Sequence, residues 1–152
     1  MKAISLWQPW ATAMALGIKK IETRGWATNY RGPLVIHAAK TPLSTICREL
    51  GEDREYMGNL WCREYVGMPF KEMPLGAILC VVNVVNCVKT EIVEVGDFLG
   101  STEWQLGNYE PGRFAWITDK VRTLAEPIPW KGSQGFFDVP DEVVRQALIG
   151  AA

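Results

Sequence analysis

Apolar segments alternate with glycine, proline and polar turns along this chain, and their spacing predicts short strands and helices. Residues 1–6 are mostly apolar and predict a first strand. Pro9 suits the first position of an apolar helix that continues from Trp10 to Leu16. Gly17 is placed to end that helix, because glycine accepts the left-handed geometry of a C-terminal cap.

The same pattern predicts further elements up to the C-terminus. Strands are expected over residues 18–26, 33–39, 75–88, 113–118, 121–128 and 136–139, and helical segments over 42–50, 53–65 and 140–149. We expect Thr41 to cap the first of these helical segments, and Asp119 and Lys120 to form a hairpin turn between two strands. Residues 90–108 mix acids, glycines and Trp104, which indicates a loop with a helical turn.

The order of these elements predicts an α+β fold. Strands and helices follow one another as β-α-β-β-α-β-β-β-α, and no glycine-rich phosphate loop follows any strand, which argues against a Rossmann unit. A small mixed β-barrel of five to six strands with short flanking helices fits better, since closure of a barrel removes exposed edges. Residues 1–152 are expected to form a single domain.

Composition and charge narrow the function classes. The chain is 48% apolar and 22% charged, as in ordinary globular proteins, and its net charge is −1. This balance disfavours a protein that binds nucleic acid through overall positive charge, so such contact has to come from a local patch. No apolar run of about 18 residues indicates a membrane span, and the N-terminus lacks a signal pattern.

The cysteines and the histidine do not form a metal-binding pattern. Cys47, Cys62, Cys80 and Cys87 show no C-x-x-C spacing, and His37 is the one histidine of the chain. This is a poor zinc set, so we expect no metal and no cofactor. Reduced, mostly buried thiols are typical of a cytoplasmic protein, which is the location that we expect.

The segment over residues 5–26 carries the most informative chemistry. Its candidate ligand-binding residues are Trp7, Gln8, Trp10, Lys19, Glu22, Arg24 and Trp26. Large aromatic side chains beside charges recur where a flat ligand stacks, and a cationic wall with a single acid suits a nucleobase with a phosphate nearby. Period-two alternation from Glu22 places Lys20 and Arg24 on the same strand face. The alternative is a solvated strand face with a cross-charge pair.

Three further candidates lie elsewhere in the sequence. His37 is the only side chain whose ordinary pKa lies near neutrality, although a histidine in an apolar strand is often a hydrogen-bonded core residue. Lys131 and Gln134 lie in a polar loop bracketed by Gly132 and Gly135. Glycines let the backbone approach a ligand closely, so these side chains would reach a phosphate or a base edge. The alternative is a turn selected for its backbone geometry alone.

These residues resemble the ASCH family, a domain named for its homology to an activating signal cointegrator. The family's hallmark, G-x-K-x-x-E-x-R, is matched by Gly17, Lys19, Glu22 and Arg24. Similar segments extend over residues 6–10, 30–38, 115–117, 126–129, 131–135 and 139–140. The resemblance covers nearly the whole chain. It selects Lys19 as the site lysine, whereas strand alternation selects Lys20.

The resemblance implies a β-barrel of the PUA-like class whose motif residues lie in a cleft beside the first helix. It also implies RNA or nucleic-acid binding, RNA modification or transcription coactivation. One branch of the family hydrolyses the acetyl amide of N4-acetylcytidine. That branch uses a lysine at the position of Lys19 and a threonine nucleophile at the position of Glu22. This chain departs from the branch at Glu22, and the adjacent Thr23 faces the opposite way by strand parity.

Three function classes remain open. In the first, the protein binds RNA or another single-stranded nucleic acid, or a free modified nucleoside, with Trp7, Trp10 or Trp26 stacking on a base. In the second, it is an amidohydrolase of a modified nucleoside such as N4-acetylcytidine, with Lys19 as general base and Glu22 activating water. In the third, an aromatic patch docks a partner protein. The sequence leaves open whether the protein is an enzyme.

Overall fold

The computed structural model describes residues 1–93 and 101–149. Its strands are β1 (Lys2–Leu6), β2 (Ile21–Arg24), β3 (Gly32–Ala38), β4 (Ala77–Lys89), β5 (Phe114–Pro129) and β6 (Phe137–Asp138). Its helices are α1 (Trp10–Ala15), α2 (Leu43–Leu50), the π-helix η1 (Tyr56–Trp61), α3 (Cys62–Tyr65), the 3-10 helices η2 (Phe70–Glu72) and η3 (Thr90–Ile92), α4 (Thr102–Gln105) and α5 (Asp141–Ile149). The predicted α+β class with short helices is confirmed.

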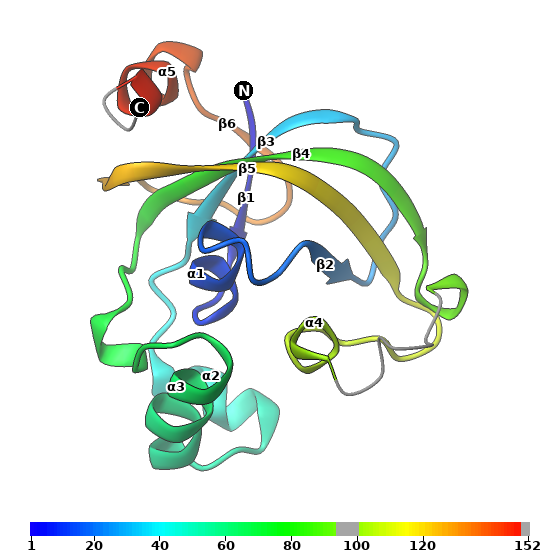
Figure 1. Cartoon of the computed structure of the whole chain (residues 1–152), viewed down its shortest axis with the longest axis vertical. Coiled ribbons are helices and arrows are strands. Elements are labelled where there is room, and N and C mark those ends of the chain that lie inside the picture. Colours follow the sequence, from blue (N-terminus) through cyan, green and yellow to red (C-terminus); the bar gives the residue numbers. More distant parts are fainter. Residues whose placement is uncertain (94–100, 150–152) are drawn as a thin grey trace.

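Within the described residues, six strands form one open sheet in the order β2-β5-β4-β3-β1-β6. β1 and β3 run parallel, and the other neighbouring pairs are antiparallel. The long strands β4 and β5 arch together across the molecule (Figure 1). The predicted closure into a barrel is wrong, because β2 and β6 lie at opposite edges of the sheet. These edge strands have only four and two residues, so they expose little unpaired backbone.

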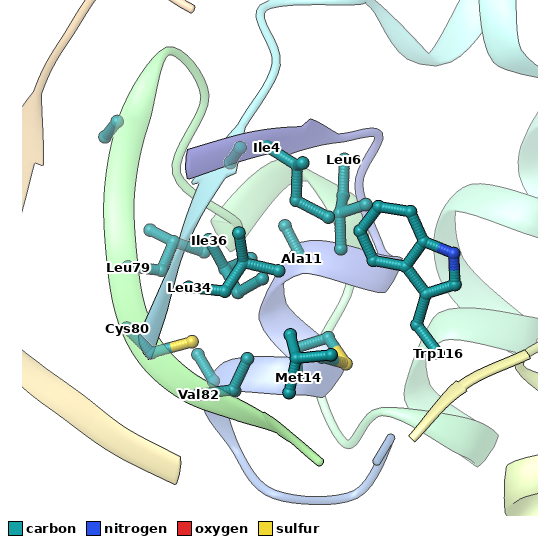
Figure 2. Packing of buried hydrophobic residues seen from close by; sticks show 14 residues of the cluster. Ile4, Leu6, Ala11, Met14, Leu34, Ile36, Leu79, Cys80, Val82 and Trp116 are labelled. Carbon is teal, nitrogen blue, oxygen red and sulfur yellow. The ribbon is translucent and has the colours of Figure 1, made fainter. Parts of the chain in front are cut away.

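Helix α1 lies under the arch of β4 and β5 and contributes to the main core (Figure 1). Its buried Ala11 and Met14 pack in one cluster with Leu6 of β1, Ile36 of β3 and Trp116 of β5 (Figure 2). The helix is followed by Gly17, whose φ of 73° lies in the left-handed region, as the sequence predicts. The chain therefore turns sharply between α1 and the short strand β2.

Both faces of β3 are buried, because its alternating side chains belong to different clusters. Leu34 and Ile36 pack with α1, whereas Val35 packs with Ile78 of β4 and Val144 of α5. Helix α5 therefore covers the sheet on the side opposite α1. A register shift of one residue would exchange the two sets of side chains, so the burial of both faces fixes the register of the central strands.

The predicted hairpin at Asp119 and Lys120 is wrong, because β5 runs unbroken through both residues. The pairing of β5 with β4 shifts in register between Val81 and Asn83. Lys120 has a φ of 50° at this point, which identifies it as part of a β-bulge. Asp119 pairs with Asn83 of β4, and Lys120 lies in the bulge, so both residues belong to one continuous ladder.

Other expectations need smaller corrections. The strand expected over residues 18–26 is limited to β2. Helix α2 has Pro42 at its N-cap with no side-chain cap bond, so Thr41 does not cap it. The helical turn expected within residues 90–108 is present as α4, and residues 94–100 of that segment lie outside the described residues. No helix in the described ranges is both long and apolar enough to cross a membrane.

The four cysteines differ in their accessibility. Cys62 and Cys80 have no exposed surface, and burial raises the pKa of each thiol to about 12. Cys87 is only partly buried. Because the thiolate is the reactive form, iodoacetamide at pH 8 is expected to alkylate Cys87 before Cys62 or Cys80 in the folded protein. Peptide mapping by mass spectrometry checks the order, and alkylation of Cys80 at the rate of Cys87 would contradict it.

Candidate functional site

A cleft of about 1020 Å³ opens beside β2. Its lining comes from β1, the start of α1, β2 and the two residues after it, the end of α2, and the chain from the end of α4 to the residue before β5. Its aromatic lining residues are Trp7, Trp10, Trp26, Trp104 and Tyr109. Its charged lining residues are Glu22, Arg24, Glu110 and Arg113. Ligand pockets for small molecules typically measure roughly 300–1,000 Å³, so this cleft has room for a nucleotide.

One wall of the cleft consists of α4 and the residues that follow it up to Tyr109, and we call it the α4 wall. Two charged side chains attach this wall to the start of β2. The carboxylate of Glu103 accepts hydrogen bonds from the backbone amides of Lys20 at 2.8 Å and Ile21 at 2.9 Å. Lys19 is only 2% exposed, and its Nζ donates to the carbonyls of Ile21 at 2.5 Å and Leu106 at 2.8 Å. Charge-assisted bonds of this kind are about twice as strong as neutral ones. They join residues 103–106 to the residues around the start of β2.

A second set of bonds holds the residues that follow α4. The amide of Asn108 donates to the hydroxyl oxygen of Thr23 at 3.0 Å. The guanidinium of Arg113 donates to the carbonyl of Thr23 at 3.1 Å and to the carbonyl of Asn108 at 3.2 Å. The Thr23 hydroxyl and the Arg113 side chain thus both take part in holding the wall in place.

Glu22 places a buried acceptor in the cleft. Its side chain belongs to a residue that is 9% exposed, and Oε2 has no hydrogen-bond partner in the structure. Among the residues that the structure describes, no lysine, arginine or histidine forms an ion pair with it. A buried acceptor without a donor costs about 1–3 kcal/mol. A ligand that donates a hydrogen bond here would remove that cost.

Tyr109 lies near this carboxylate and remains a phenol at neutral pH. Burial raises the pKa of Tyr109, and the negative charges of Glu103 and Glu22 raise it further. The Tyr109 ring stacks on Trp104, with 5.0 Å between ring centroids and 14° between the planes. The α4 wall therefore carries a pair of parallel aromatic rings beside the acidic group.

Arg24 lies over a cluster of aromatic rings on the β2 side of the cleft. Its guanidinium carbon is 5.5 Å from the ring centroid of Trp26 and 5.9 Å from that of Trp116. Trp26 packs edge-on against Trp116 at 4.7 Å and against Phe136 at 5.4 Å. The indole nitrogen of Trp116 donates to the carbonyl of Trp26 at 3.2 Å. These contacts hold Arg24 and Trp26 in place before any ligand arrives.

The structure brings together part of the candidate set from the sequence. The candidates that line the cleft are Trp7, Trp10, Glu22, Arg24 and Trp26. The candidates that do not line it are Gln8, Lys19, His37, Lys131 and Gln134. Gln8 is buried, accepting from the amide of Thr12 at 2.9 Å and donating to the carbonyl of Pro74 at 2.8 Å. Lys131 and Gln134 are exposed.

His37 connects the sheet to the loop that contains Gly132. Its Nε2 lies 2.8 Å from the carbonyl of Trp130, and its Nδ1 lies 2.8 Å from the hydroxyl of Ser5. A carbonyl only accepts, so Nε2 carries the proton, and in the neutral ring Nδ1 accepts from Ser5. Burial lowers the pKa of His37, and the bond to Trp130 opposes part of that effect.

This lowered pKa makes stability depend on pH. In the unfolded chain His37 titrates near its ordinary value of 6.5, and in the folded protein it titrates below that value. Between the two values the unfolded state binds more protons, so stability is expected to fall as pH decreases below 6.5. Urea unfolding from pH 7.5 to 5.5 measures the loss. The variant His37→Gln should show a shallower decline, and an equally steep one would contradict this role.

The sequence did not single out the α4 wall as part of the site. Trp104, Tyr109 and Arg113 line the cleft, and Glu103 anchors the wall to β2. The only available signal was an aromatic and acidic pair, Glu103 and Trp104, within an otherwise polar stretch. In the described part of the chain, no group of three or more His, Cys, Asp or Glu side chains is placed to hold a metal ion.

Comparison with known proteins agrees with this architecture. The sequence model of the ASCH domain family matches residues 4–127 of this chain. The crystal structure of ASCH from Zymomonas mobilis superposes with a TM-score of 0.57 at 15% identity, covering 98% of this chain and 93% of that chain. Two mutant forms of that protein give TM-scores of 0.56 and 0.55 at 14% and 15% identity, covering 98% of this chain and 96% and 94% of theirs. These likenesses show the fold. No curated protein matches this chain.

Proposed function

This chain belongs to the ASCH domain family, and on that premise we propose that its aromatic cleft binds a nucleobase, either within single-stranded RNA or in a free nucleoside. The observation that carries the proposal is the buried, unpartnered oxygen of Glu22 inside a cleft lined by aromatic rings. Aromatic rings stack on any base, at about 1–3 kcal/mol per base, and a carboxylate accepts hydrogen bonds from a base edge.

Arg24 supplies the positive charge that a ribonucleotide requires. It lines the cleft and lies over the rings of Trp26 and Trp116, and a guanidinium there can contact a phosphate or stack on a base. Lys19 does not serve this purpose in the proposal, since its ammonium donates to two backbone carbonyls and is buried. The role of Lys19 is to hold the cleft wall.

The test is fluorescence polarisation at low salt, with a labelled single-stranded RNA that contains all four bases. Arg24→Ala is expected to weaken binding about tenfold, because a charge-assisted contact is lost. Arg63→Ala is the matched control, since Arg63 is exposed on α3 and does not line the cleft. No saturable binding to RNA or to nucleosides by the unaltered protein would contradict the proposal and favour a protein partner.

Salt dependence provides a second check. The cleft lining contains two acids and two arginines, so few phosphates can be neutralised there. Each phosphate contact on a single strand contributes a slope of about −0.7 to a plot of log affinity against log salt. With at most two contacts, the slope is expected to be about −1.4 or shallower. A slope of −4 or steeper, measured by the same titration, would indicate a basic surface outside this cleft.

The same Glu22 oxygen favours one alternative, hydrolysis of an acyl amide on a modified nucleoside. A carboxylate without a donor can bind and activate water, whereas the ammonium of Lys19 donates hydrogen bonds to two backbone carbonyls. Incubation with N4-acetylcytidine, followed by chromatography for cytidine, tests this alternative. Turnover that is lost in Glu22→Gln would support it, and absence of turnover in a protein that binds the nucleoside would leave binding as the function.

A further inference from the structure

Glu22 lines the cleft, and one oxygen of its carboxylate receives no hydrogen bond from the protein. Oε2 is buried and has no partner, and a carboxylate can only accept. The neighbouring lysine, Lys19, directs its Nζ to the carbonyls of Ile21 and Leu106. The guanidinium of Arg24 lies over Trp26 and Trp116 and forms no ion pair with Glu22 in the described residues. A ligand edge with two adjacent donors satisfies such a group best.

We propose that the cleft selects guanine, with the N1–H and N2–H₂ donors of its Watson–Crick edge bound to the two oxygens of Glu22. This inference rests on the proposed function and specifies its ligand. Guanine is the only common base of RNA with two neighbouring donors on that edge. Adenine and cytosine place a ring-nitrogen acceptor beside their amino group, and uracil has a single N–H between two carbonyl oxygens. Each of these would direct a lone pair at a carboxylate oxygen.

Discrimination therefore comes from Glu22 and general affinity from the aromatic walls. The lining rings, such as the stacked pair of Trp104 and Tyr109, provide flat surfaces that any base can use. A good bidentate contact discriminates against a wrong base by about 1–3 kcal/mol. The preference for guanine over each of the other bases is accordingly expected to be tenfold or more.

The test uses four labelled RNA pentamers, in which a central G, A, C or U is flanked by two adenosines on each side, and a fifth with central inosine. The pentamer with central G is expected to bind at least tenfold more tightly than those with A, C or U. The inosine pentamer should have an intermediate affinity, because inosine keeps N1–H and lacks the amino group. Unlabelled guanosine monophosphate serves as competitor. Competition at concentrations near the pentamer Kd indicates that a free nucleotide suffices, and no competition indicates that guanine is bound within a strand.

Glu22→Gln tests the mechanism on the protein side. A carboxamide offers one acceptor and one donor, so the variant should lose the preference for guanosine and favour adenosine or cytidine. Such a reversal would not follow from a merely structural role of Glu22. Should the variant fold poorly, the comparison of guanosine with inosine in the unaltered protein still decides the point.

The outcomes separate this inference from the proposal that it extends. Equal binding of all five pentamers would overturn guanine selection and leave nucleobase binding intact. Absence of binding by every pentamer and by guanosine monophosphate would overturn both.

Discussion

Replacing Lys19 with alanine is expected to destabilise the fold by about 3 kcal/mol. The substitution removes two charge-assisted hydrogen bonds, leaves the carbonyl of Ile21 and the buried carbonyl of Leu106 without this donor, and opens a cavity where a side chain is 2% exposed. For a chain of this length, such a loss lowers the melting temperature by roughly 10 °C. Thermal unfolding followed by circular dichroism measures the change.

Lys20→Ala is the matched control for this variant. Lys20 is the next residue along the chain, but its side chain is exposed, and only its backbone takes part in the anchoring. Its substitution is expected to change stability by less than about 0.5 kcal/mol. Equal effects of the two substitutions would contradict the role assigned to Lys19. Ligand affinity should also fall in Lys19→Ala, because Leu106 belongs to the wall that this lysine holds.

Gly132→Ala is the substitution with the next largest expected effect. A methyl group at this position would lie 2.5 Å from Cε1 and 2.6 Å from Nδ1 of His37, and it would also meet the hydroxyl of Ser5. Real contacts are never so short, so the loop has to move away from β1 and β3. Overpacking of this kind costs about 1–3 kcal/mol. Urea unfolding should show the loss.

A second alanine substitution serves as its control. At Gly25 an added methyl group meets only the end of the Arg113 side chain, at 4.0 Å. Gly25→Ala is therefore expected to be close to neutral for stability. The His37 contact also predicts that Gly132→Ala weakens the pH dependence described above, because a loop that moves away leaves His37 more open to water, and burial is the main cause of its lowered pKa. Unchanged stability in Gly132→Ala would show that the loop is not packed against His37.

The sequence predicts the individual elements well where a local signal defines them. The glycine that ends α1 and the apolar strand β4 both follow directly from their residues. The position of Lys19 does not follow from the local pattern. The amides of Ile18 and Lys19 both donate to the carbonyl of Ala13, so the chain is still turning at Lys19 and β2 begins only at Ile21. Strand alternation from Glu22 therefore does not extend back to the two lysines, of which Lys19 is buried and Lys20 is exposed. The family pattern selects Lys19, and the cleft lining includes neither.

The long-range features could not be predicted from local pattern. The polar pair of Asp119 and Lys120 has the composition of a turn, and only its pairing with β4 makes it part of a bulged strand. The sheet is open, and not the expected barrel, because β2 and β6 are its two edge strands and do not pair with each other. The α4 wall is attached through Glu103, which bonds to amides more than 80 residues earlier in the sequence.

The candidate residues chosen from the sequence likewise fall into two groups, those that line the cleft and those that do not. Residues of the hallmark segment, Glu22 and Arg24, line the cleft together with the tryptophans near them in sequence. His37 has contacts of a core residue and connects the sheet to the loop near Gly132. A histidine and a glycine-bracketed loop offer no local signal that separates such a structural contact from a ligand contact.

Chemical-shift mapping by NMR tests the central claim most directly, with ¹⁵N-labelled protein titrated with single-stranded RNA that contains all four bases. We expect shifts at the indole N–H groups of Trp7, Trp10 and Trp26, and at the backbone amides of residues 22–26 and 104–109, which line the cleft. Shifts confined to residues 130–135, or to the exposed face of α3, would contradict a nucleobase site in this cleft.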